Sequence, residues 1–425
     1  MITMIQKNDT KKLINNFLSL FIVQGSNFIV PLLTFPYIVH VIGIEKFGLL
    51  AFATAFTAYP MLLVMYGLDL SGAREVASSK NSKRRLSIIL SSILLVRVVL
   101  MLVAALITFL IVFNFDRFSK DWLLYVITFG SIMGTMIFPI WFFQGMEKMK
   151  FITYLSIGSR LLYMVGIFVF LQKEEDYLYV PLLNLITLFL VGIISLVVID
   201  REFGVKLIFP RIKYLVLQFI KGWHLFISHF AINLFTSFNM LVLGLVATDL
   251  VVGYYALAEK VVKIIASLFK PLNQALFPHV VQLVKKSTEK GKAFVNKISL
   301  YIFLVSMFLW GTFFILSEQI FELVFGKEAV TSIPVFNILS ILIIIMPLAT
   351  WMYNVILISF KLEKYFIKIF STIAILNVIV IASLLPWFEV KENVIAFSLV
   401  FSEVVSLVFG IYLYKTKVLT SRYVK

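Results

Sequence analysis

The sequence predicts an all-α membrane protein with twelve transmembrane helices, divided six and six, and three observations support that fold class. Of its 425 residues, 61% are hydrophobic and only 14% are charged, and the mean hydropathy is +1.00. Soluble globular chains are nearer half apolar and a quarter charged. Long apolar runs recur along the chain, and the loops between these runs are short.

A transmembrane helix needs about 20 mostly apolar residues, and twelve runs reach that length. The first run begins at Leu13, after Lys7, Lys11 and Lys12, and it is too long for a signal peptide. We therefore expect it to be retained as the first span. The expected spans are 13–41, 46–70, 86–115, 122–144, 152–171, 178–199, 217–247, 254–279, 298–317, 334–359, 366–386 and 394–414.

The basic residues of the loops predict the orientation of these spans. Of the 38 Lys and Arg residues, 25 lie in loops on one side and six lie in loops on the other. Loops rich in Lys and Arg stay in the cytoplasm, so both termini are expected there. The same bias explains most of the net charge of +16, and we expect no nucleic acid partner.

The longest loop on the cytoplasmic side, 200–214, divides the chain into two halves of six spans. A short pattern recurs at the same place in each half. Span two contains Gly48, Ala51 and Ala53, and span eight contains Gly253, Ala256 and Ala258, at a constant offset. Parallel repeats of this kind occur in transporters. The expected domains are an N-terminal bundle at 1–200, a linker at 201–216 and a C-terminal bundle at 217–425.

Span eight carries an unusual number of charges for a helix in lipid. Within 257–278 lie Glu259, Lys260, Lys263 and Lys270. Each lysine at a helix centre costs about 2.5–3.5 kcal/mol of insertion free energy. On an ideal helix the polar residues fall within an arc of about 140°. We therefore expect this face to line a bundle interior or a water-filled cavity.

Local pairing is the alternative explanation for part of this polar face. Glu259 and Lys263 are four residues apart, which allows an ion pair along one helix. Lysines near the end of a span can also extend to the membrane interface. This alternative suits Lys260 and Lys263, but it suits Lys270 poorly, because Lys270 lies in the middle of the expected span.

Cations outnumber acids inside the expected spans. The cations are Arg97, Arg160, Lys221, Lys260, Lys263, Lys270 and Lys368, and the acids are Asp69, Glu259 and Glu403. This excess favours an anionic ligand such as phosphate, pyrophosphate or an acidic sugar. The residues expected to bind substrate are Lys263, Lys270, Lys260, Arg97 and Lys221.

Few groups inside the spans can exchange a proton, and these are the candidates for ion coupling. The candidates are Glu259, Asp69 and His224. Each has a structural alternative: Asp69 can pair with Arg74, and His224 can be a hydrogen-bonded core residue. Arg97 can likewise bind backbone carbonyls or Glu403 instead of substrate. Cysteine is absent and the four histidines have no metal-binding spacing, so we expect no cofactor or metal.

Three motifs resemble one family of membrane proteins. They are YGLDLSGAREVA at 66–77, FPIWFFQGMEKMKFIT at 138–153 and KPLNQALFPHV at 270–280. Together with the division into six and six spans, they resemble Wzx-type O-antigen or polysaccharide-unit flippases. That family belongs to the multidrug/oligosaccharidyl-lipid/polysaccharide exporter superfamily. The most specific positions are Trp141, Phe143, Gln144, Gly145, Glu147 and Met149.

The resemblance implies two six-helix bundles around a central cavity that opens alternately to each side of the membrane. It implies a location in the bacterial cytoplasmic (inner) membrane and a substrate built on undecaprenyl pyrophosphate with a short glycan. Spans one, two, seven and eight would line the cavity, and a proton or sodium gradient would drive transport. The lipid bilayer and the polysaccharide polymerase machinery are the other partners it suggests.

Three other functions fit the same composition less well. A multidrug exporter for cations should have an acidic cavity, and a lipid II flippase usually has extra spans. A membrane-embedded polysaccharide polymerase or glycosyltransferase would be an enzyme. Such enzymes tend to carry a large outer loop or paired acids, whereas every loop here is short and no D-x-D motif occurs. We therefore expect a transporter without enzymatic activity.

Overall fold

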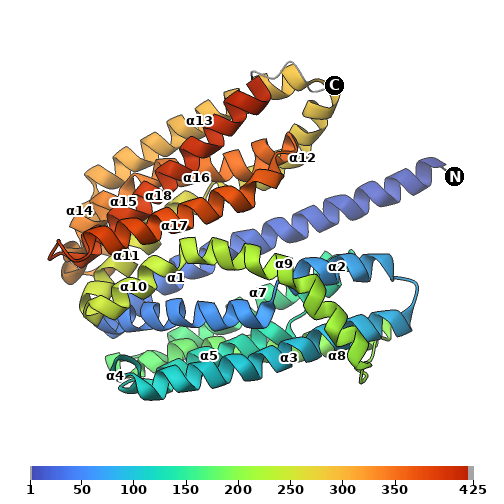
Figure 1. Cartoon of the computed structure of the whole chain (residues 1–425), viewed down its shortest axis with the longest axis horizontal. Helices are drawn as coiled ribbons and strands as arrows, with labels where there is room; N and C mark the ends of the chain where they lie inside the picture. Colours follow the sequence, from blue (N-terminus) through green and yellow to red (C-terminus); the bar gives the residue numbers. More distant parts are fainter. Residues whose placement is uncertain (1, 420–425) are drawn as a thin grey trace. The chain divides into compact units, whose positions relative to one another are not determined.

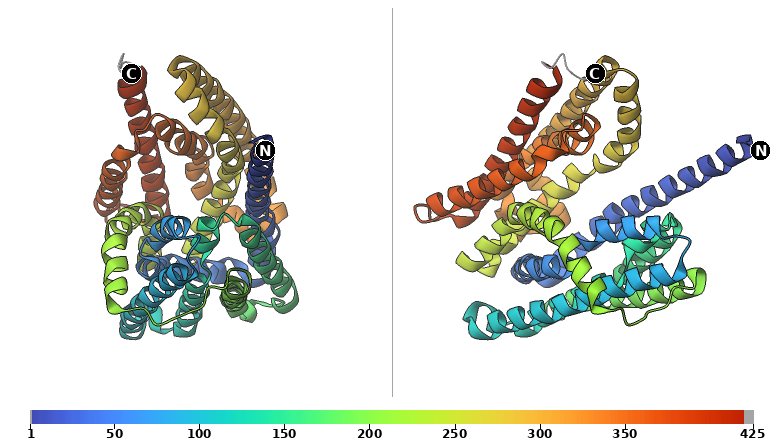
Figure 2. Two further views of the ribbon diagram at one scale, coloured as in Figure 1. Left: turned by 90° about the vertical axis from the view of Figure 1, so that its right-hand side faces the viewer. Right: turned by 45° about the vertical axis from the view of Figure 1, so that its right-hand side comes forward.

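The computed structural model describes residues 2–419, and it describes the side chains of 29–223, 225–227 and 237–419. All secondary structure in that part of the chain is helical, in every view (Figures 1 and 2). This confirms the predicted all-α fold class. The chain forms two compact units, which are described one at a time.

Unit 1 comprises Met1–Ile42 and Ala53–Phe230. It holds most of α1 (Ile2–Met65) and the described part of α9 (Ile212–Thr236) up to Phe230. The helices between them are α2 (Leu68–Ser78), α3 (Lys83–Asn114), α4 (Asp116–Ser119), α5 (Trp122–Ile137), α6 (Ile140–Gly145), α7 (Met149–Phe170), η1 (Glu174–Leu178) and α8 (Tyr179–Phe203).

Unit 2 comprises Gly43–Phe52 and Ala231–Lys425. Its helices are α10 (Phe238–Val246), α11 (Asp249–Ser267), α12 (Lys270–Lys286), α13 (Thr288–Ile315), α14 (Ser317–Phe325), η2 (Lys327–Ser332), α15 (Ile333–Ser340), α16 (Leu342–Trp351), η3 (Met352–Leu357), η4 (Glu363–Tyr365), α17 (Phe366–Leu384), α18 (Lys391–Leu413) and η5 (Tyr414–Leu419). The boundaries of these units differ from those of the expected domains, and the domains 1–200, 201–216 and 217–425 stay a prediction.

The chain is a multi-pass membrane protein. Within the described residues, eight helices are long and apolar enough to cross a membrane, or nine if Lys327–Ser340 and Leu342–Leu357 form one bent span. One of the eight, Ile29–Ser78, has 50 residues and contains a break at Gly43, where φ is 73°. It therefore includes parts of expected spans one and two. The expected total of twelve stays a prediction.

The most specific family motif forms the core of unit 1. Trp141, Phe142 and Phe143 are completely buried where α6 packs against α2. Gly145 ends α6, and a Cβ atom at this position would lie 2.6 Å from the Cβ of Val76. Only glycine allows α2 to approach so closely. The aromatic residues and the glycine of this motif therefore have a packing role in unit 1.

The two glycines of the recurring sequence pattern contact each other in unit 2. Residues 43–52, from the start of expected span two, cross the first turns of α11 at Gly48 and Gly253. A Cβ atom on Gly48 would lie 2.5 Å from the backbone nitrogen of Gly253, and one on Gly253 would overlap the backbone of Ile44. Small residues allow this close approach of helix backbones in membranes.

We expect Gly253→Ala to destabilise unit 2, because the added methyl group has no space at this crossing. Overpacking of this kind costs about 1–3 kcal/mol of unfolding free energy. Gly311 is the matched control, because a Cβ atom there meets nothing within 4 Å. Thermal unfolding in detergent should show a lower Tm for Gly253→Ala and no loss for Gly311→Ala. Equal Tm values for the two variants would contradict the crossing.

Candidate functional site

The expected site residues are divided between the two units. Asp69, Arg97 and Lys221 lie in unit 1, and all those of expected span eight lie in unit 2. His224 lies in helix α9, but its side chain is outside the described residues. Each group is described within its own unit.

In unit 1, Arg97 and Asp69 form an ion pair between α3 and α2. Nη2 of Arg97 lies 2.8 Å from Oδ1 of Asp69. The Arg97 side chain has no exposed surface, whereas 54% of the Asp69 side chain is exposed. Nε and Nη1 of Arg97 have no hydrogen-bond partner within the described part of the chain. Within unit 1, the partner of Asp69 is therefore Arg97 and not Arg74.

A sharp turn places Asp69 at this position. Tyr66 and Gly67 both have positive φ, 49° and 68°, and this turn separates α1 from α2. Asp69 then lies in the first turn of α2, where the helix dipole favours a negative charge. The carboxylate has one oxygen held by a buried guanidinium and is open to the surroundings on its other side.

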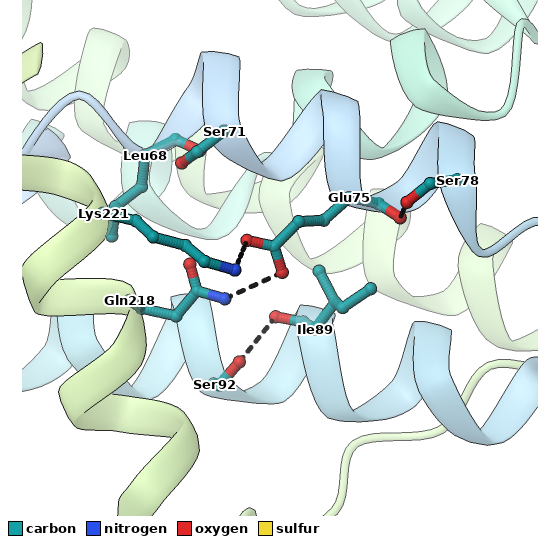
Figure 3. Close-up of polar contacts among 8 residues, drawn as sticks. All are labelled: Leu68, Ser71, Glu75, Ser78, Ile89, Ser92, Gln218 and Lys221. Carbon is teal, nitrogen blue, oxygen red and sulfur yellow. Dashed lines mark hydrogen bonds and ion pairs between the residues drawn. The ribbon is translucent and has the colours of Figure 1, made fainter.

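Lys221 is held by a second carboxylate of unit 1, as Figure 3 shows. Its Nζ lies 2.8 Å from Oε1 of Glu75 on α2. Nε2 of Gln218 donates a 3.0 Å hydrogen bond to the other oxygen of Glu75, and Gln218 is buried. Both oxygens of Glu75 are thus bound by α9. The ammonium group of Lys221 is therefore already paired with Glu75 in this structure.

Aromatic packing fastens α9 to the same turn. The Tyr66 ring stacks on Phe226 with centroids 5.1 Å apart and meets the edge of Phe219 at 5.5 Å. A Cβ atom on Gly222 would lie 2.5 Å from the Tyr66 ring. Residues 217–230 of expected span seven therefore belong to unit 1, whereas α10, the continuation of that span, belongs to unit 2.

In unit 2, Glu259 and Lys263 pair along α11, as the local alternative predicted. Their charged atoms lie 2.8 Å apart. The Glu259 side chain is only 11% exposed, whereas that of Lys263 is 44% exposed. Lys260 lies on a different side of the helix, with its Nζ 5.5 Å from the ring centroid of Phe47. A buried carboxylate thus orients an accessible ammonium.

The polar face expected for span eight is interrupted. Expected span eight is not one straight helix, because α11 ends at Ser267 and α12 begins at Lys270, directly before Pro271. Lys270 is exposed in the first turn of α12, whereas Asn273 is buried. Angles that assume one continuous helix therefore hold only as far as Ser267. Lys263 and Lys270 are both exposed, but they do not lie on one continuous helical face.

A buried amide cluster of unit 2 was not recognised as a site from the sequence. Nδ2 of Asn377 on α17 donates to Oδ1 of Asn239 on α10 at 2.6 Å. Nδ2 of Asn239 donates to Oγ of Ser398 at 3.2 Å and to the carbonyl of Ile395 at 3.3 Å, both on α18. The available signal was Asn377 itself, a lone amide in an apolar span, which usually faces the bundle interior. Glu75 was missed because it lies outside the expected spans, and Gln218 was missed because it lies in an otherwise apolar run.

The two ion pairs of unit 1 should differ in their contribution to stability. Asp69→Asn leaves the completely buried Arg97 without a counter-charge, which costs about 3 kcal/mol of unfolding free energy. Glu75→Gln leaves the partly exposed Lys221 without a counter-charge, which costs about 1 kcal/mol or less of unfolding free energy. Thermal unfolding in detergent should show a Tm several degrees lower for Asp69→Asn than for Glu75→Gln. The reverse order would refute the assignment of Arg97 as the buried partner.

Sequence comparisons show similarity to proteins of polysaccharide biosynthesis. The model of the family described as "Polysaccharide biosynthesis protein" matches residues 13–284. Two curated relatives bear the name "Putative O-antigen transporter". One, from Escherichia coli (strain K12), is 28% identical over 66% of this chain and 68% of that protein. The other, from Shigella dysenteriae, is 26% identical over 93% of this chain and 98% of that protein.

Solved structures of transporters share the fold. One is titled "Inward-facing conformation of a multidrug resistance MATE family transporter of the MOP superfamily"; its TM-score is 0.71 at 12% identity, over 92% of this chain and 96% of the other. The "eukaryotic MATE transporter AtDTX14" has a TM-score of 0.61 at 14% identity, over 96% of both chains. At such identities the likeness shows the fold alone. The family match covers more than half of the sequence, so this chain belongs to the polysaccharide biosynthesis protein family, in agreement with its resemblance to Wzx-type flippases.

Proposed function

We propose that the protein is a flippase for lipid-linked oligosaccharide repeat units. Its substrate would be undecaprenyl pyrophosphate bearing an O-antigen-type or capsule-type glycan, moved from the cytoplasmic to the outer leaflet of the bacterial inner membrane. The observation that carries this proposal is the similarity, over 93% of the chain, to the relative named "Putative O-antigen transporter". The transporter fold of the solved neighbours agrees with a carrier and gives no support to an enzyme.

The accessible cations of unit 2 suit the pyrophosphate. Lys263 and Lys270 are exposed, and each can donate charge-assisted hydrogen bonds to phosphate oxygens. Lys260 lies about one turn before Lys263 on α11 and adds a positive charge to that helix. Arg97 of unit 1 is a poorer candidate, because its side chain has no exposed surface. Lys221 is a poorer candidate, because Glu75 and not the substrate is its partner here.

Each candidate coupling acid is paired with a candidate substrate-binding cation. Glu259 is paired with Lys263, and Asp69 is paired with Arg97. A pyrophosphate bound to the cation would compete with the carboxylate for it. The carboxylate is also the candidate proton carrier, so substrate binding and proton binding would be linked at one pair.

The substrate-binding role is tested by Lys263→Ala/Lys270→Ala in a strain that lacks the gene. Loss of two charge-assisted contacts should reduce transport about tenfold or more. We expect less surface glycan and more lipid-linked repeat units on the cytoplasmic side, at equal membrane levels of the protein. Lys292→Ala is the matched control, because Lys292 is engaged by Glu289 at 2.8 Å.

Two outcomes would separate the parts of this proposal. Unchanged surface glycan and unchanged lipid-linked pools in the deletion strain would overturn the flippase function. Restoration of wild-type glycan by Lys263→Ala/Lys270→Ala would overturn the cationic site alone. One structural neighbour is a multidrug resistance transporter, but the exposed candidate side chains of unit 2 are those of Lys263 and Lys270, which suit cationic drugs poorly.

Proton coupling is tested by Glu259→Gln, which fixes the neutral form of this side chain. In proteoliposomes we expect the variant to lose the acceleration of flipping that an imposed pH gradient gives the wild type. Glu318→Gln is the control, because Glu318 is exposed at the start of α14, and it should keep the response. A full gradient response in Glu259→Gln would exclude Glu259 as the coupling group.

A further inference from the structure

Residues 204–211, which connect α8 to α9, have no regular secondary structure and are hydrogen-bonded to α3 at two points. Gly204 ends α8 in a left-handed conformation, with φ 64°, and this turns the chain back toward the bundle. Val205 is then buried, and the core cluster of unit 1 includes it. The segment is therefore packed against the protein, and it is not a loop in open solvent.

Two hydrogen bonds fix the register of this segment on α3. The backbone N–H of Lys206 donates to Oγ of Ser87 at 3.2 Å, and that of Ile208 donates to Oγ of Ser91 at 2.9 Å. Four residues of a helix rise about 6 Å, and two residues of an extended strand advance about the same distance. The two elements therefore run side by side in the same direction.

This register sets the depth of the segment in the membrane. Helix α3 begins with Lys83, Arg84 and Arg85, which are exposed and belong at the headgroup level. The helix then becomes a membrane span, and Ser91 lies about 9 Å beyond Arg85 along the axis. Ile208, bound to Ser91, must lie at a similar depth. That distance matches the 5–10 Å to which interfacial segments bury their apolar face.

The exposed side chains of the segment fit that environment. Phe209 is 99% exposed, Ile212 is 76% exposed and Leu207 is 57% exposed. In water, three neighbouring apolar side chains would be exposed without compensation. On the first turns of α9 the same exposure continues with Val216 and Ile220. A continuous apolar surface thus extends from the segment onto a helix.

The charges beside these apolar groups have one sign. Residues 204–213 contain Lys206, Arg211 and Lys213 and no acid. The side chain of Lys83 lies against Gly204, where a Cβ atom would be 2.8 Å from its Nζ. Each basic residue at an anionic membrane surface contributes about 1 kcal/mol of binding free energy. Basic groups at the rim and apolar groups below them match the two layers of an anionic leaflet.

We propose that residues 204–213 form an interfacial anchor that lies within the cytoplasmic leaflet and binds anionic phospholipid headgroups. The leaflet follows from the orientation expected from the basic loops. The anchor holds the beginning of α9 against unit 1, next to the contacts of Glu75 with α9. It is independent of the transported substrate, because it rests only on the segment, α3 and α9.

The depth of the segment can be measured directly, because the chain has no cysteine. A spin label on Phe209→Cys, in the full-length protein, is compared with one on Asn81→Cys, an exposed position in the loop before α3. In phosphatidylcholine vesicles containing phosphatidylglycerol, the Phe209→Cys label should collide with oxygen more often, and with a water-soluble nickel chelate several-fold less often. Equal nickel accessibility at the two positions would overturn the anchor.

The preference for anionic lipid is tested separately. Adding phosphatidylglycerol to phosphatidylcholine vesicles should increase the depth of the Phe209→Cys label. Lys206→Gln/Lys213→Gln in that background should remove at least half of the increase. The matched control Lys148→Gln/Lys150→Gln removes two exposed lysines elsewhere in unit 1 and should leave the increase unchanged. A depth that does not respond to phosphatidylglycerol, or an equal response in both double variants, would refute headgroup binding.

Discussion

A charge inside a bilayer is stable only where the protein compensates it, and this constraint organises the polar parts of the structure. Arg97, with no exposed surface, is balanced by Asp69, and Glu259 is balanced by Lys263. Glu75 accepts from both Lys221 and Gln218. In each case a carboxylate and a cation come from the same unit. The low dielectric of the surroundings makes an uncompensated partner far more costly than in water.

Close backbone contact is the second organising feature, and it explains why glycine recurs at particular positions. Gly48 and Gly253 cross in unit 2, and Gly145 brings α6 onto α2 in unit 1. Burial of apolar surface does not favour helix association in lipid, so close packing at small residues must provide the favourable free energy. The recurring pattern noted in each half of the sequence therefore marks one shared crossing, in which residues 43–52 pack with the second unit.

One of these pairs also suits the proposed transport. At Glu259 and Lys263 a buried carboxylate holds an accessible cation, to which a pyrophosphate could bind. Expected span seven is divided between the two units: residues 217–230 contact Glu75 and Tyr66 in unit 1, whereas α10 is bound through Asn239 to α17 and α18 in unit 2. The interfacial anchor would hold its cytoplasmic end.

Composition and periodicity by themselves determined the helical class and the multi-pass character, because a span must be apolar and satisfy its backbone internally. They also identified the charged residues of span eight and the option of a Glu259–Lys263 pair, which is local in sequence. They did not determine which residues pair when the partners are distant in the sequence. Asp69 meets Arg97 and not Arg74 because the turn at Tyr66 and Gly67 redirects the chain. The contact of Lys221 with Glu75 and the register of residues 204–211 on α3 were likewise decided by tertiary packing, because each depends on a neighbouring helix that no local pattern specifies.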